Sequence, residues 1–443
     1  MADPDGAPVG LRPEEEAALL RPRPGLDLAG PAYDGRSLPN VAASIVRATG
    51  VSLGDGPPTP PPLAPSIDPL GDDPGDGPLL LLLVDGLGWF PFSAWSRRSR
   101  SSAAPAWAAG AHPITTVYPT TTVAALVSLS TGTTPAQHGV VAPNLYLPRL
   151  GGVIDVLRMA RIESAGREEL VGPDGTLSGI SGAPPLFRRG LSGTAVSREA
   201  FRGTGFSRLL YEGAEFVGYA TASDFAHTLA EVLGRPAPPP VVFAYWDELD
   251  TVQHLRGVDP RLVDFELDRL VGLLGHVART LGPSRARSVR ALVSADHGFV
   301  PVDPARQLRI DRLPEIAEAM ARPLAGDRRS GFLGARPGRL HDLEAACRRR
   351  LPPGSRLLRV DDALAAGLFG PPPYHPELRE RIGDLIVLPA VPYGLLGPSP
   401  RPGSRSPEFR GSHSGLDAAE LLVPLVAGPL SELGGTGRTG GQP

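Results

Sequence analysis

The chain has 443 residues, a length that can bury a large core and that suggests two or three structural units. Its formal net charge is -3 and its pI is near 6.3, so it lacks the basic field that would attract a nucleic-acid polymer. A single cysteine, Cys347, excludes an internal disulfide and a metal cluster built from cysteines.

The sequence shows no targeting or membrane segment. Residues 1–10 are acidic and rich in Pro and Gly, without the basic stretch and apolar stretch of a signal peptide. The longest continuous apolar run, residues 79–84, is too short to cross a bilayer. We therefore expect a cytoplasmic protein with no membrane span, and its oligomeric state stays open.

Residues 1–78 form a Pro/Gly-rich N-terminal segment with short helices. Residues 1–35 are expected to lie loosely on the surface, apart from a helix at 13–20. A second helix is predicted at 39–50, where Gly50 ends the pattern. Residues 54–78 contain too much Pro, Gly and Asp to make a packed element, so the ordered core begins near residue 79.

Between residues 79 and 300, apolar strand patterns alternate with amphipathic helix patterns. The clearest helix is 260–281, whose apolar residues keep a period of 3.6. Strands are expected at 79–84, 153–159, 194–197, 215–219, 241–245 and 291–295, and further helices at 123–131 and 222–233. This alternation predicts an α/β fold with a mainly parallel central sheet and helices on both faces.

The pattern changes after residue 300. Residues 301–407 contain an Arg-rich helix at 340–351 and an isolated strand at 384–388, which we interpret as a small inserted cap subdomain. A core strand returns at 421–427. The expected catalytic core therefore comprises residues 79–300 and 408–433, followed by a disordered tail at 434–443.

Polar residues of metal-binding type follow the predicted strands. In an open α/β sheet, ligands collect beyond the carboxyl ends of the strands. Three Asp and three His make two sets of oxygen and nitrogen ligands, which suit zinc or a similar first-row ion better than calcium. These candidate ligands are Asp85, Asp250, His254, Asp296, His297 and His413.

A run of threonines precedes the helix predicted at 123–131. Thr122 is placed at the helix N-terminus, where unpaired backbone N–H groups and the helix dipole favour an anion. Thr120 and Thr121 read as turn residues, although either could compete with Thr122 as a nucleophile. His138 reads as a structural histidine in a loop bounded by glycine.

Six short motifs follow one another between about residue 79 and residue 427. They are Val84-Asp85-Gly86, Pro119-Thr120-Thr121-Thr122, Ser130-Thr131-Gly132 with His138-Gly139, Asp250-Thr251-Val252-Gln253-His254, Ser294-Ala295-Asp296-His297-Gly298, and Gly411-Ser412-His413. With these motifs the sequence resembles the alkaline phosphatase superfamily, most closely its nucleotide pyrophosphatase/phosphodiesterase branch.

The resemblance implies a role for each matching residue. One metal ion would be bound by Asp250, His254 and His413, and the other by Asp85, Asp296, His297 and the oxygen of the nucleophile Thr122. Asn144 would contact the phosphate. The implied cofactors are two divalent ions, most simply Zn²⁺ with Mn²⁺ as an alternative. The implied reaction is cleavage of phosphodiester or pyrophosphate bonds in small nucleotide-type substrates through a covalent phospho-threonine.

Other functions stay open at this stage. A phosphomonoesterase, a phosphonate hydrolase or a manganese-using mutase of the same superfamily is the main alternative, although a mutase would be expected to use serine where Thr122 stands. A non-catalytic metal-binding protein is the alternative from another class. Metal analysis combined with assays on phosphate monoesters and diesters would separate these functions.

Overall fold

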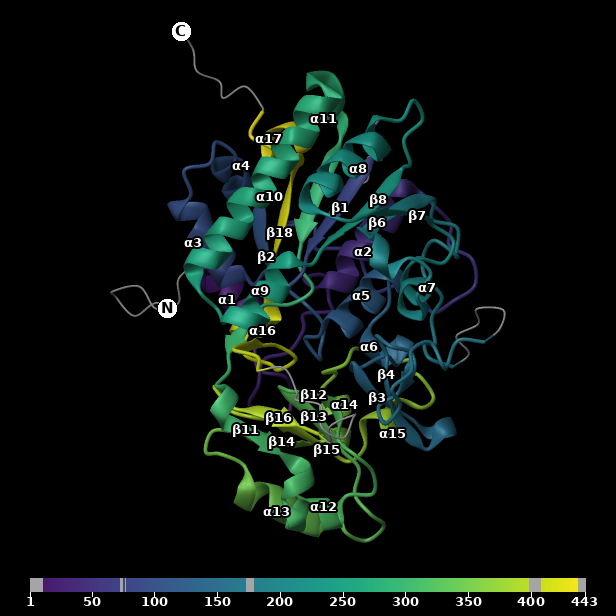
Figure 1. Ribbon diagram of the computed structural model, residues 1–443, viewed down its shortest axis with the longest axis vertical. Coiled ribbons are helices and arrows are strands. Elements are labelled where there is room, and N and C mark those ends of the chain that lie inside the picture. The colour runs from purple at the N-terminus through teal and green to yellow at the C-terminus, as the bar shows by residue number, and fades with distance from the viewer. Residues whose placement is uncertain (1–10, 72–74, 76, 173–178, 398–407, 437–443) are drawn as a thin grey trace.

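The computed structural model describes residues 11–71, 75, 77–172, 179–397 and 408–436. The described chain contains two separate seven-stranded sheets, the first in the upper half of Figure 1 and the second in the lower half. Among the described helices, none combines the length and apolar character needed to cross a bilayer. The end of the predicted disordered tail, residues 437–443, lies outside the described residues.

The first sheet is mainly parallel. Strand β1 has six consecutive buried apolar residues, as expected for a parallel strand covered on both faces. It pairs in parallel with β8 and β9, and β6 pairs in parallel with β7 and β8, whereas β18 is antiparallel to β9 and β2. In spatial order the strands are β2 (Ala111–Thr115), β18 (Leu422–Pro429), β9 (Arg290–Ser294), β1 (Leu79–Val84), β8 (Val241–Trp246), β6 (Gly193–Arg198) and β7 (Glu215–Tyr219).

Helices cover both faces of this sheet. Helices α3 (Trp89–Arg98), α8 (Ala222–Gly234), α10 (Pro260–Leu281) and α11 (Pro283–Ser288) lie in front of it in Figure 1, and α2 (Leu38–Thr49) and α5 (Thr122–Thr131) lie behind it. Helix α10 has the bounds predicted from its periodicity, and it buries the stripe that includes Val263, Leu267 and Leu270. The predicted fold class is confirmed.

The second sheet is antiparallel and is drawn from two distant parts of the sequence. In spatial order its strands are β14 (Arg356–Arg359), β15 (Leu385–Leu388), β13 (Ser330–Leu333), β12 (Ala325–Asp327), β3 (Asn144–Leu147), β4 (Gly152–Asp155) and β5 (Ala160–Arg161). Helices α12 (Pro314–Ala319) and α13 (Leu340–Arg350) enclose a second apolar cluster that buries Cys347. The sequence pattern assigned residues 144–161 to the catalytic core, yet they share this sheet with the predicted cap. The division into domains stays a prediction.

Several shorter elements connect these layers. They are α1 (Pro13–Leu19), α4 (Ala104–Ala109), α6 (Pro135–His138), α7 (Gly205–Tyr211), α9 (Glu248–Arg256), α14 (Val360–Ala365), α15 (Leu378–Ile382), α16 (Ala418–Leu421), α17 (Leu430–Leu433), β10 (Val300–Pro301), β11 (Gln307–Arg309), β16 (Gly394–Leu396) and β17 (Gly411–Ser412), with 3₁₀ turns at Pro148–Leu150, Glu199–Phe201, Pro304–Arg306 and Ile310–Arg312. The strand predicted at 153–159 is replaced by the short strands β4 and β5.

The N-terminal segment packs more closely than its composition suggested. Helices α1 and α2 form where they were predicted, but the expectation that residues before 35 lie loosely is wrong for the described part, since Leu19 and Tyr33 are buried. The backbone N–H of Ala32 donates to Thr115 Oγ1 in β2 at 2.8 Å. Leu63, in the stretch predicted to be a linker, is also buried. Isolated apolar residues in a Pro-rich segment are therefore enough to hold it against the sheet.

The register of the sheet decides where functional residues gather. Leu83 of β1 pairs with Tyr245 of β8 and with Ser294 of β9. These three parallel strands consequently end side by side at one edge of the sheet, between the two sheets. The segments that follow them carry most of the candidate ligands.

Candidate metal centre and nucleophile

Each candidate ligand is delivered by the end of a strand or by the first helix after it. Asp85 follows β1, and Asp296 with His297 follows β9. Helix α9 follows β8 and presents Asp250 and His254 one turn apart. His413 follows the short strand β17, which pairs with β10. The chain thereby brings residues from four distant segments to one edge of the sheet.

The first group of ligands surrounds His297. Its Nε2 lies 3.5 Å from Asp85 Oδ1, 3.3 Å from Asp296 Oδ2 and 3.1 Å from Thr122 Oγ1. The side chains of His297 and Asp296 are fully buried, and that of Asp85 is nearly so. Ligand atoms of Asp85, Asp296 and His297 lie within 4.8 Å of one another, which is close enough to share one ion.

The second group surrounds Asp250. Its Oδ1 lies 3.3 Å from His254 Nε2 and 3.9 Å from His413 Nε2. The rings of His297 and His413 are stacked with their centroids 3.6 Å apart, so the two groups adjoin. All six candidate ligands, together with Thr122, therefore lie in one cluster. The second group whose ligand atoms lie within 4.8 Å of one another is Asp250, His297 and His413, and the predicted ligand His254 lies beside Asp250 outside that group.

The chemistry of these residues fits divalent cations. Asp85 Oδ1, Asp250 Oδ1 and Asp296 Oδ2 are buried oxygens with no hydrogen-bond partner among the described residues. Burial, followed by the neighbouring Asp296, raises the pKa of Asp85 and Asp250 well above the ordinary value. Desolvated carboxylates this close together are costly unless positive charge accompanies them. Two divalent ions would supply that charge, so the residues fit the metals implied by the resemblance.

The three candidate histidine ligands are held in the neutral form by their surroundings. Burial lowers the pKa of His254 to about 4 and of His297 to about 3, and it lowers the pKa of His413 well below the ordinary value. The Nδ1 atoms of His254, His297 and His413 face the carbonyl oxygens of Gly411 at 3.0 Å, Gly298 at 3.2 Å and Thr120 at 2.9 Å. A carbonyl only accepts, so each Nδ1 carries the proton and each Nε2 keeps its lone pair for a metal.

The three threonines before α5 have different surroundings. Thr122 is the first residue of α5, and its hydroxyl lies in the ligand cluster. The Thr121 side chain caps the helix by accepting from the Ala124 N–H at 3.3 Å. The Thr120 hydroxyl donates to Gly415 O and accepts from Ser414 N, each at 3.0 Å. The geometry thus favours Thr122 as the nucleophile and gives Thr120 and Thr121 structural partners.

Asn144 lies at the start of β3, in the second sheet. It lines a cavity of about 190 Å³ together with Asp155, Arg158, Asp327 and Arg328. The Asp327 carboxylate helps to raise the pKa of Asp250, and burial raises the pKa of Asp327 itself to about 6. The cavity therefore contains a carboxylate whose charge acts on the candidate ligand Asp250.

Arg328 connects this cavity to a candidate metal ligand, His254. Its guanidinium carbon lies 4.5 Å from the centroid of the Phe409 ring, and that ring stacks on His254 at 4.3 Å. Sequence reasoning missed Asp327 and Arg328 because they lie in the predicted cap, where no motif marks them. It also missed Tyr245, whose hydroxyl donates to Asp85 Oδ2; its position just before Asp247 at the end of β8 could have indicated it.

His138 is a buried structural residue, as its Gly-bounded loop suggested. Its Nδ1 accepts from the Val140 N–H at 3.0 Å, and its Nε2 lies 2.9 Å from Ser128 Oγ. Burial lowers the pKa of His138 to about 3. Its role is to join the loop after α6 to helix α5.

Comparison with known proteins agrees with this geometry. The family model of type I phosphodiesterase / nucleotide pyrophosphatase matches residues 79–415, a span that contains all six ligands, Thr122 and Asn144. The chain belongs to this family. Its members are hydrolases of phosphoester bonds, so the predicted enzyme class and family resemblance are confirmed. No curated protein sequence matches this member of the family.

Solved structures show the same fold. An inactive variant of murine ectonucleotide pyrophosphatase/phosphodiesterase 5, in complex with AMP, is 16% identical with a TM-score of 0.57; the match covers 80% of this chain and 88% of that one. The human protein of the same name is 16% identical with a TM-score of 0.56, covering 79% and 87%. At this level of identity the likeness concerns the fold alone.

Proposed function

We propose that this family member is a two-metal phosphohydrolase that cleaves phosphodiester or pyrophosphate bonds of nucleotide-type substrates through a covalent phospho-threonine at Thr122. Asp250, His254 and His413 would hold one ion, and Asp85, Asp296 and His297 the other, with the Thr122 oxygen beside it. Zn²⁺ fits the mixture of carboxylate and imidazole ligands best, and Mn²⁺ is the alternative. The AMP bound to the murine relative supports a nucleotide-type substrate.

One observation carries the proposal. The Thr122 hydroxyl lies 3.1 Å from His297 Nε2, inside a cluster that contains three buried and unpartnered carboxylate oxygens. A threonine hydroxyl is a weak nucleophile at neutral pH and needs activation. This position beside the candidate ligands is the one expected of a hydroxyl that a metal ion activates.

The residues of the chain divide the work of the reaction. Bound divalent ions lower the pKa of a hydroxyl and neutralise charge that develops on phosphoryl oxygens. Thr122 Oγ1 forms the new bond to phosphorus while the bond to the leaving oxygen breaks, and attack by water then releases the phosphoryl group from Thr122. Because Thr122 begins α5, backbone N–H groups at the start of this ten-residue helix would lie close to the transferred group. Asn144, Asp327 and Arg328 would contact the part of the substrate that occupies the cavity.

Replacing the nucleophile tests the proposal. We expect Thr122→Ala to keep two metal ions per chain and to lose at least about 10³-fold in kcat, as expected for loss of a nucleophile. Thr122→Ser, which keeps a hydroxyl, is the matched control and should retain measurable turnover. Substrates should include bis-p-nitrophenyl phosphate, p-nitrophenyl phosphate and a p-nitrophenyl ester of a nucleotide. Undiminished activity of Thr122→Ala would remove Thr122 from its role.

The same assays separate the alternatives. A faster reaction with the monoester would indicate a phosphomonoesterase. Bound metal without hydrolysis of any ester would indicate a metal-binding protein. The cytoplasmic location expected from the sequence is part of the proposal, and it would be tested by fractionating cells that produce the protein.

A further inference from the structure

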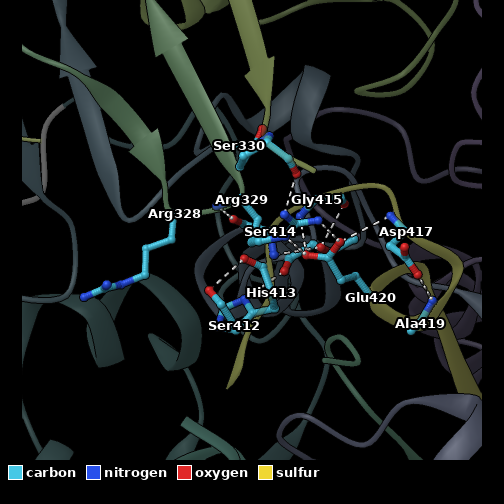
Figure 2. Close-up of polar contacts among 12 residues, drawn as sticks. Arg328, Arg329, Ser330, Ser412, His413, Ser414, Gly415, Asp417, Ala419 and Glu420 are labelled. Atoms are coloured by element: carbon cyan, nitrogen blue, oxygen red, sulfur yellow. Dashed lines mark hydrogen bonds and ion pairs between the residues drawn. The ribbon is translucent and has the colours of Figure 1, made fainter. Parts of the chain in front are cut away.

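The turn between β12 and β13, residues 327–330, rests against the segment that carries His413. Figure 2 shows two neighbouring arginines of this turn extending in different directions, with Arg329 entering the polar cluster around Ser414 and Arg328 extending away from it. The Arg329 backbone N–H donates to Ser414 Oγ at 3.0 Å. The second sheet thereby contacts the residue next to a candidate metal ligand.

Arg329 forms a buried ion pair with Glu420. Their side chains are 5% and 0% exposed, and Arg329 Nε lies 3.4 Å from Glu420 Oε1. A second contact, from Nη2 to Oε2, is also 3.4 Å. Arg329 Nη1 donates to the carbonyl oxygens of Pro389 and Tyr393. The guanidinium group is thus fixed on several sides.

Glu420 in turn contacts two segments that follow candidate metal ligands. Its carboxylate accepts from the backbone N–H of Gly415 at 2.9 Å and of Asp417 at 3.2 Å. Its own carbonyl oxygen accepts from the Gly298 N–H at 2.9 Å. One residue therefore contacts both the segment after His413 and the segment after His297.

The segment after His413 needs such support because its backbone is strained. Ser414 has φ +100°, a region that residues with a side chain rarely adopt. Its N–H donates to Thr120 Oγ1, and the Thr120 hydroxyl donates to Gly415 O. The Thr120 carbonyl accepts from His413 Nδ1, which sets the direction of the imidazole. A continuous set of contacts thus runs from Arg329 through Ser414 and Thr120 to His413.

We propose that Arg329 and Glu420 are a positioning pair, which holds the strained segment 413–415 so that His413 Nε2 points at Asp250. The inference rests on the proposed function only in assuming that His413 binds a metal. A buried ion pair contributes little net stability compared with apolar residues of the same size. The contribution of this pair is therefore the geometry of the ligand segment.

The experiment measures zinc binding to the metal-free full-length chain, by titration against a competing zinc indicator. We expect the neutral double variant R329M/E420Q to bind one of two zinc ions at least about tenfold more weakly, the usual effect of losing a partner that orients a ligand. With bis-p-nitrophenyl phosphate, kcat should fall while KM stays within about twofold, because the pair orients His413 and lies outside the substrate cavity.

Three further variants keep the test decisive. Thr120→Val removes the hydroxyl that joins Ser414 to Gly415 with almost no change of volume, and it should also weaken one zinc ion, whereas Thr120→Ser should restore the affinity. The control is Arg381→Met. Arg381 is another fully buried arginine, which pairs with Glu377 and with the carbonyl oxygens of Gly139 and Ile180. It should lower the unfolding midpoint without changing zinc affinity.

The outcomes separate this inference from the proposed function. Two zinc ions on the native chain, with one weakened in R329M/E420Q and Thr120→Val, would support the positioning pair. Native affinity in both variants would overturn it and leave the metal centre intact. Equal weakening in Arg381→Met would also overturn it, because the effect would then be general destabilisation. A native chain that binds neither zinc nor manganese would overturn the proposed function itself.

Discussion

Replacement of Gly298 by alanine should disrupt the packing directly behind the candidate ligands Asp296 and His297. A Cβ atom at this position would lie 2.0 Å from the carbonyl oxygen of Ala419 and 2.9 Å from the Cα of Gly88. Both obstacles are backbone atoms, so no side chain can rotate to make room. Overpacking a core typically costs about 1–3 kcal/mol. We expect the upper end of this range, because two backbone segments must move.

The assay is urea unfolding together with steady-state kinetics. With an m value of about 3 kcal/mol per M, a loss of about 3 kcal/mol lowers the unfolding midpoint by about 1 M. We also expect kcat to fall by about 10²-fold, the effect of displacing a catalytic group by about 1 Å. The displacement would arise because Gly298 follows His297 directly, and its N–H donates to Glu420 O.

Gly272→Ala is the matched control. Gly272 is exposed in the middle of α10, and a Cβ atom there would meet no atom within 4 Å. The same substitution should therefore stabilise the protein by about 0.5–1 kcal/mol, the usual gain in a helix interior. A Gly298→Ala protein with the native urea midpoint and the native kcat would refute the reasoning.

Three further predictions concern pH, metal and substrate. Burial lowers the pKa of His138 from 6.5 to about 3, so as the pH falls this histidine is protonated in the unfolded chain before it is protonated in the folded one. The free energy of unfolding is therefore unaffected by His138 well above pH 6.5. Below pH 6.5 it falls by about 1.4 kcal/mol per pH unit because of this group. His138→Asn should show a shallower decline in unfolding free energy between pH 6.5 and 4.5, and an unchanged slope would contradict this. Removal of divalent metal by a chelator should lower the unfolding midpoint, and zinc at about 1,000 times its Kd should restore about 4 kcal/mol for each of the two sites, about 8 kcal/mol in all. Identical unfolding curves with and without metal would contradict two buried sites. Arg328→Ala should raise KM for a nucleotide ester about tenfold, roughly the loss of one charged hydrogen bond, with a smaller change in kcat, whereas an unchanged KM would place the substrate elsewhere.

The elements with strong periodicity could be located from the sequence alone. Helix α10 keeps one apolar stripe over about six turns, so its local pattern and its packing against the sheet favour the same bounds. The strands β1 and β8 are continuously apolar and buried, a pattern that predicts their place in the middle of a parallel sheet. The six candidate ligands could be named because strand ends of a parallel sheet meet at one edge, and the order of the motifs along the chain indicated which residues to choose. Their role as ligands stays a prediction.

The second sheet could not be predicted in the same way. Its strands β3, β12 and β13 have three or four residues each, which is too short for a pattern of alternating positions to identify a strand, even in β3, where burial does alternate. Their pairing joins residues 144 and 326, and local sequence carries no information about such a distant partner. The ion pair of Arg329 with Glu420 was missed for this reason, although the Asp417-x-x-Glu420 pattern at the start of α16 is a recognisable capping box.

The second sheet is built from two distant parts of the chain, and this limits which segments of the enzyme can be removed or exchanged. Strand β12 covers the free edge of β3, and it comes from a stretch more than one hundred and fifty positions further along the chain. A chain shortened by excision of residues 301–407 would leave β3 with unpaired amide and carbonyl groups, which invite association with other chains. Grafting this region onto a relative would equally require the matching hairpin of β3 and β4. The stretch 301–407 therefore supplies only part of this sheet, and it could not be exchanged without the strands that it pairs with.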